Sequence, residues 1–89
     1  MKRFYYCVYD KKAESFAPIF EQESDKGCIA NVTREVMSGK GSIAQYPEDY
    51  KLYRVGVQDS ETGEFVPELI LLMDLTEVQY AKDAKQAQV

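Results

Sequence analysis

The sequence contains no histidine and no tryptophan, and it has only 2 cysteines among 89 residues. Histidine is the side chain that titrates near neutral pH and the commonest metal ligand, so its absence argues against acid–base catalysis and against a zinc site. Cys7 and Cys28 are best interpreted as small buried apolar side chains. No serine has a catalytic base beside it, and Ser24 fits a helix cap better than a nucleophile. The sequence therefore predicts no enzyme activity, no metal and no cofactor.

Long apolar runs and an excess of positive charge are also missing. The longest apolar run, from Leu69 to Met73, is 5 residues long, whereas a membrane-spanning helix needs about 20. The N-terminus is basic but lacks the apolar core of a signal peptide. We therefore expect a cytoplasmic protein without membrane contact. The 15 acidic and 11 basic residues give a net charge of -4, which argues against a strongly basic nucleic-acid binder but leaves room for a local basic patch.

The length and composition of the chain allow one small domain. Hydrophobic residues make up 45% of the 89 positions, and a chain of this size buries only about 60% of its unfolded surface. We expect one α+β domain over residues 1–78 and a frayed polar tail over residues 79–89.

Aromatic and β-branched residues predict strands at residues 2–9, 15–22 and 50–58 and a fourth strand at 64–67 that extends through 69–73. Pro18 should lie at an edge or bulge of the second strand. Ile29, Val32 and Val36 form one apolar stripe, which predicts a helix over 28–38 capped by Ser24. The predicted fold is two antiparallel β-hairpins in one sheet with a single helix on one face, in the order ββαββ, followed by a short helix from Asp74.

The two predicted hairpins resemble each other at a constant offset of 49 positions, which pairs Asp10 with Asp59 and Phe16 with Phe65. Both aspartates are expected to begin turns. Because side chains alternate along a strand, the offset predicts two faces. One face, which meets the helix, carries Phe4, Tyr6, Val8, Tyr53, Val55 and Val57. The opposite face carries Arg3, Tyr5, Cys7, Tyr9, Tyr50, Leu52, Arg54 and Gly56.

The second of these faces is a candidate binding surface. Bases of single-stranded nucleic acid stack on aromatic rings while cations meet the phosphates, and this combination is offered by Arg3, Tyr5, Tyr9 and Arg54. The competing interpretation is that the 7 tyrosines reflect strand propensity, core packing or a homodimer interface. A homodimer is expected because a small core leaves this face in need of cover.

Several stretches of the sequence resemble the small nonstructural protein of gokushovirus-type microviruses, which are single-stranded DNA phages. The most specific stretch is Pro47-Glu48-Asp49-Tyr50-Lys51-Leu52-Tyr53, followed by Gly56 and then by the turn Asp59-Ser60-Glu61-Thr62-Gly63-Glu64-Phe65. The resemblance covers about residues 4–66. It implies a non-enzymatic accessory protein of the host bacterial cytoplasm that acts in genome replication or packaging, in some accounts by binding DNA. It implies no catalytic or binding residues.

Two functions remain open at the level of sequence. The first is an accessory role in replication or packaging of a single-stranded DNA genome, with single-stranded DNA or phage or host replication and packaging proteins as partners. The alternative is a protein-interaction module that captures a phage or host protein through a sheet face or edge and has no nucleic-acid affinity.

Overall fold

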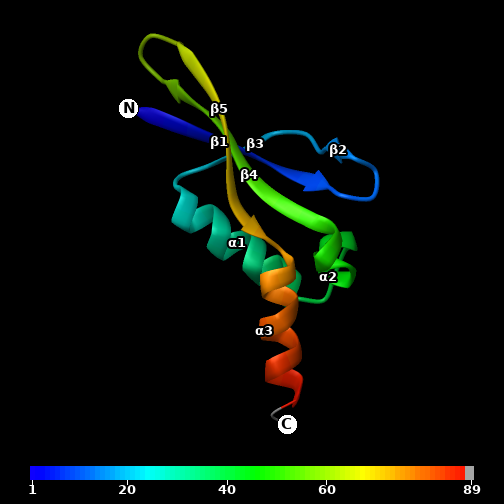
Figure 1. The fold of residues 1–89 in the computed structure, drawn as a ribbon. Coiled ribbons are helices and arrows are strands. Elements are labelled where there is room, and N and C mark those ends of the chain that lie inside the picture. Colours follow the sequence, from blue (N-terminus) through cyan, green and yellow to red (C-terminus); the bar gives the residue numbers. More distant parts are fainter. Residues whose placement is uncertain (88–89) are drawn as a thin grey trace.

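The computed structural model describes residues 1–87 and shows one antiparallel sheet with helix α1 on one face (Figure 1). The α+β class is confirmed, but the simple ββαββ order is wrong because the second strand is split and more than one helix is present. The elements in chain order are β1 (Lys2–Asp10), β2 (Ser15–Phe16), β3 (Phe20–Gln22), α1 (Asp25–Met37), α2 (Ser42–Gln45), the 3-10 turn η1 (Pro47–Asp49), β4 (Tyr50–Asp59), β5 (Phe65–Asp74) and α3 (Thr76–Ala87).

The sheet has the strand order β2-β1-β4-β5, and β3 also pairs with β1. One edge is therefore formed by two very short strands, and Pro18 lies in the gap between them. Proline has no backbone N–H to donate to a ladder, which explains the break and agrees with the expected edge position. The other edge is the continuous strand β5. No helix among residues 1–87 is both long and apolar enough to cross a membrane.

Helix α1 is positioned by the cap that the sequence predicts, but it begins at Asp25, three residues before the expected start. The hydroxyl of Ser24 accepts a hydrogen bond of 3.0 Å from the N–H of Gly27, and Asp25 adds negative charge at the positive end of the helix. Val32 and Val36 point into the core with Cys28. The stripe thus fixes α1 against the sheet.

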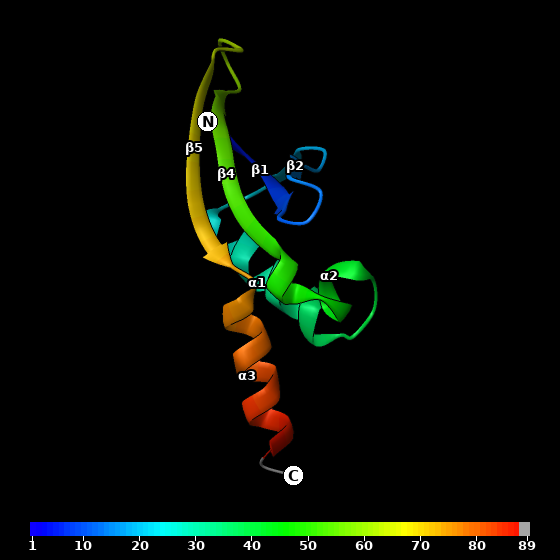
Figure 2. The ribbon, with the colours of Figure 1, turned by 45° about the vertical axis from the view of Figure 1, so that its right-hand side comes forward.

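The core lies between α1 and the half of the sheet where β4 begins and β5 ends. Tyr6 of β1 and Leu52 of β4 are fully buried there, and they pack in one cluster with Cys28, Val32, Val36, Met73, Leu75 and Val78. The end of β4 and the start of β5 extend beyond α1 (Figure 2), and β1 pairs with β4 there as far as Asp59. Because α1 is shorter than the sheet and covers one side only, much of the sheet surface lacks a covering layer.

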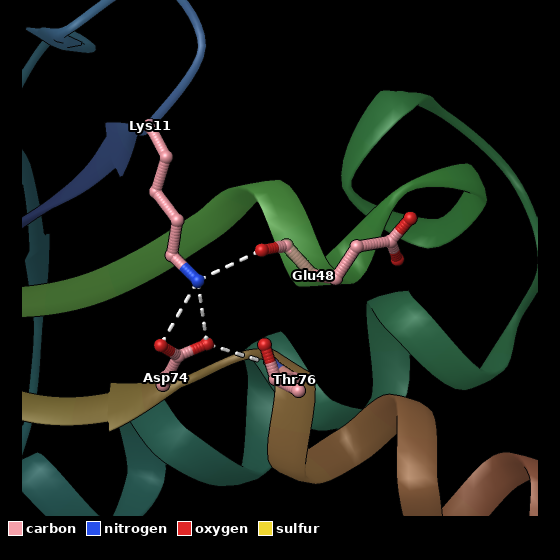
Figure 3. A network of polar contacts seen from close by, with 4 residues as sticks. All are labelled: Lys11, Glu48, Asp74 and Thr76. Atoms are coloured by element: carbon pink, nitrogen blue, oxygen red, sulfur yellow. Dashed lines mark hydrogen bonds and ion pairs between the residues drawn. The ribbon is translucent and has the colours of Figure 1, made fainter.

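A polar network fastens the lower end of the sheet to α3 (Figure 3). The Lys11 ammonium donates to the carboxylate of Asp74 at 2.9 Å and to the backbone carbonyl of Glu48 at 2.8 Å. Asp74 also accepts a 2.9 Å hydrogen bond from the N–H of Thr76, in the first turn of α3. Partial burial acts to raise the pKa of Asp74, but the hydrogen bonds from Thr76 and Lys11 outweigh it and hold that pKa below its usual value.

The C-terminal region follows β5 directly. The short helix expected from Asp74 is present as α3, with Leu75 and Val78 buried against the core, and it continues through Ala87. The frayed tail expected over 79–89 stays a prediction, and its last residues, 88–89, lie outside the described residues.

Candidate nucleic-acid interface

A β-bulge in β4, opposite β1, decides which side chains of these two strands share a face of the sheet. Tyr5 of β1 pairs with Gly56, but the next residue, Tyr6, pairs with Arg54, so Val55 has no direct partner on β1. One extra residue reverses the alternation of side chains along the rest of the strand. Strand β1 has no bulge at the corresponding position. The offset of 49 positions therefore assigns Val57 to the correct face of the sheet, but it assigns the residues from Arg54 back to the start of β4 to the wrong face.

The predicted placement of Arg54 on the face of Tyr5 and Tyr9 is therefore wrong. Arg54 lies on the helix side, where it lines an open cleft with Phe4 and Val57. Its guanidinium forms an ion pair of 2.5 Å with Asp25 at the start of α1. The same reversal places Leu52 in the core and brings Tyr53 to the opposite face, against the sequence-based assignment of both residues.

The carboxylate of Asp25 connects the helix to both central strands. It accepts a hydrogen bond of 2.8 Å from the Tyr6 hydroxyl and holds the Arg54 guanidinium. Burial, and then the hydrogen bond to Asp25, raise the pKa of Tyr6. The guanidinium of Arg54 is thus held in this network on the helix side of the sheet, and its Nε is buried without a partner among residues 1–87.

The face opposite α1 brings three of the four predicted residues together. Arg3, Tyr5 and Tyr9 alternate along β1, and Cys7 lies between the two tyrosines with only 1% of its surface exposed. Arg3 lies opposite Gln58 of β4, whose amide oxygen accepts a hydrogen bond from the Tyr5 hydroxyl. Burial raises the pKa of the Cys7 thiol, so this cysteine is inert packing beneath the rings.

Three further aromatic residues complete this face. The ring of Tyr9 packs on Phe16 at a centroid distance of 4.7 Å and meets Tyr53 edge-on at 6.4 Å, while Phe16 and Tyr53 are 5.6 Å apart. Farther along the sheet, Tyr5 contacts Phe65 edge-on at 5.9 Å. The open aromatic face is defined here as Tyr5, Tyr9, Phe16, Tyr53 and Phe65.

Sequence reasoning missed Phe16, Tyr53 and Phe65 for separate reasons. The bulge places Tyr53 on this face, whereas regular alternation predicts that it lies on the helix side. Phe16 and Phe65 each follow a turn whose length sets their cross-strand partners, Tyr9 for Phe16 and Gln58 for Phe65. The signal that was available is the repeated turn: Asp10 accepts from the N–H groups two and three residues later, and so does Asp59.

Gly56 has a specific role on the open aromatic face. A Cβ at this position would lie 2.2 Å from the Cζ of Phe65, far inside van der Waals contact. The absence of a side chain lets the Phe65 ring approach the β4 backbone closely. Glycine inside a strand often marks such a close approach, and here it leaves room for the Phe65 ring beside Tyr5.

The open aromatic face carries charge of both signs at its margins. Arg3 follows the same side of β1 as Tyr5, and Lys51 lies opposite Tyr9 in β4. Glu21 of β3 lies opposite Tyr5. The rings offer surfaces for stacking, and the two cations lie at opposite ends of the row.

Comparison with known proteins identifies the family. A family model described as phage ORF5 protein matches residues 3–78. Protein ORF5 of Chlamydia phage 1 is 32% identical over 71 residues, which cover 75% of this chain and 74% of that protein. No solved structure matches the chain. The resemblance to a small microvirus protein is thereby confirmed, and the chain belongs to the phage ORF5 protein family.

Proposed function

We propose that this protein is a non-enzymatic accessory factor in replication or packaging of the single-stranded phage genome, and that it binds single-stranded DNA on the open aromatic face. The observation that carries the proposal is the aromatic row itself. Five rings lie on the side of the sheet away from α1, and Phe16 and Phe65 are 48% and 42% exposed.

Stacking on such a row is tolerant of sequence because every base has a π-face. Each stacked base contributes roughly 1–3 kcal/mol, so two or three stacks give useful affinity without a large basic surface. Arg3 and Lys51 supply the phosphate contacts in place of Arg54. With only two cations and a net charge of -4, the salt dependence should be shallow, because the slope follows the number of phosphates neutralised.

The test is a titration of a fluorescently labelled oligothymidylate, followed by anisotropy, at two salt concentrations. Tyr53→Ala should weaken binding by about 10-fold or more and leave the salt slope unchanged. Arg3→Ala should weaken binding less but reduce the slope. Tyr80→Ala is the matched control, since Tyr80 is 70% exposed on α3 and away from the sheet, and it should bind as the parent protein does.

The alternative function, a protein-interaction module, is separated by the same titration. If the folded parent protein binds no oligonucleotide at either salt concentration, the alternative function is favoured and the open aromatic face becomes a candidate protein interface. If it binds but Tyr53→Ala and Arg3→Ala have no effect while both variants stay folded, DNA binds elsewhere. Either result contradicts the proposal.

A further inference from the structure

The two edges of the sheet differ in how they are protected. The β2–β3 edge consists of strands of 2 and 3 residues separated by Pro18. Very short edge strands and prolines are common features that prevent pairing with another chain. The β5 edge is a continuous strand of 10 residues that pairs with β4 only. Its outer backbone groups have no partner strand in the part of the chain that the structure describes.

The β5 edge also lacks the basic side chains that discourage association. It has no lysine or arginine, and Pro67 is its only proline. Its register with β4 shifts between Pro67 and Ile70 and again between Leu71 and Met73. Between these irregular points, Leu69 and Leu71 are 58% and 51% exposed. An apolar edge strand with no neighbour is a site for strand addition. Figure 2 shows β5 as the outermost strand along the whole length of the sheet.

We infer that β5 pairs antiparallel with β5 of a second copy of this chain, about a two-fold axis through Ile70. A strand that pairs with itself antiparallel is self-complementary, as a two-fold interface requires. The exposed leucines select the register, because apolar side chains directly opposite each other stabilise a sheet. Leu69 and Leu71 are the two exposed leucines of the strand.

Neighbouring registers do not set the two exposed leucines against each other. An axis through Glu68 sets that residue against its own copy, and like charges directly opposite each other destabilise a sheet. An axis through Leu69 sets Leu71 against Pro67 of the second copy, and an axis through Leu71 sets Leu69 against the buried Met73 of the second copy. An axis through Ile70 instead sets Leu69 against Leu71 of the second copy, which covers both exposed leucines.

The interface so assigned replaces the homodimer surface expected from sequence. That surface included Leu52, which is fully buried in the core and has no access to a partner. Pairing through β5 keeps the open aromatic faces of both copies free and on the same side of one continuous sheet, because the two-fold axis is perpendicular to the sheet.

Sedimentation of the full chain at micromolar concentration, without DNA, tests this inference independently of the proposed function. The parent protein should sediment as a dimer. Leu69→Lys should raise the dimer dissociation constant about 10-fold or more, since each copy then places a charge against an apolar neighbour. Ile19→Lys is the matched control, because Ile19 is also 58% exposed but lies beside the protected edge, and it should remain dimeric.

Disulfide trapping tests the register. In Ile70→Cys the two new thiols face each other across the axis, where Cα atoms of antiparallel partners are about 4.5–5.5 Å apart, within disulfide range. Mild oxidation should trap a covalent dimer of Ile70→Cys but not of Glu64→Cys. A protein of 10.2 kDa that stays monomeric, a dimer insensitive to Leu69→Lys, an open-ended polymer, or trapping at position 64 in place of 70 would each overturn the inference.

Discussion

Tyrosines lie on both faces of the sheet, but they are buried on one face and partly exposed on the other. On the helix side, Tyr6 is fully buried and its hydroxyl is bonded to Asp25. On the other side, Tyr9 and Tyr53 are only half-buried and contact other rings, with no helix above them. The comparison shows that tyrosine content alone does not reveal a binding surface. What matters is which tyrosines the helix covers, and that depends on the register of the strands.

The largest expected effect comes from placing a charge on the covered face. Val32 is 5% exposed in the core, so Val32→Asp buries an unpaired carboxylate and should abolish cooperative folding. Ala30→Asp, on the exposed side of the same helix, should leave a folded protein. Circular dichroism during heating compares the two. A cooperative melt of Val32→Asp at the parental temperature would show that α1 is not packed as described.

A smaller loss is expected from the link between α1 and the two central strands. Asp25→Ala removes hydrogen bonds to Tyr6 and Arg54 and leaves the guanidinium, whose side chain is 20% exposed, without its partner. We expect a loss of about 1–3 kcal/mol in the free energy of unfolding, measured with urea. Adding Arg54→Met should recover part of the loss. Losses that simply add would indicate that the pair does not interact.

The open aromatic face should be sensitive to the space above Gly56. Gly56→Ala forces the Phe65 ring away from the sheet and should cost about 1–3 kcal/mol in stability. Phe65→Ala alone should be milder, and the double variant should tolerate the alanine at position 56 better than the parent background does. A double-mutant cycle in urea measures this coupling, and additive effects would place the ring elsewhere.

The two faces differ in how far sequence alone could predict them. The stripe of Val32 and Val36 and the Ser24 cap are local patterns that predicted α1 correctly. Pro18 was correctly expected at an edge, but the strand predicted over 15–22 is split there. The bulge at Val55 is not visible in the residue pattern, because it depends on how β4 pairs with β1. This one extra residue places Arg54 on the helix side and Tyr53 on the open aromatic face, and regular alternation along the strand predicts the reverse for both. The candidate site was therefore only half predicted, although the fold class was correct.

The smallest expected effect lies at the end of the sheet, where Lys11 holds Asp74. The folded pKa of Asp74 is lowered relative to an unfolded value of about 3.9. Its contribution to stability is therefore present above about pH 4 and is lost as the pH falls through the folded pKa. Asp74→Asn should cost up to about 1 kcal/mol at neutral pH. In urea melts the difference from the parent should vanish in strong acid, and a difference independent of pH would contradict this assignment.

The proposed DNA-binding surface is tested most directly by NMR of the tyrosine rings in the unmodified protein. Addition of oligothymidylate should move the ring signals of Tyr5, Tyr9 and Tyr53, because stacked bases shift nearby protons. The ring signals of Tyr6, which is buried beneath α1, and of Tyr80 on α3 should not shift. Shifts confined to Tyr80, or no shifts at DNA concentrations that saturate binding, would contradict the assignment of the open aromatic face as the DNA-binding surface.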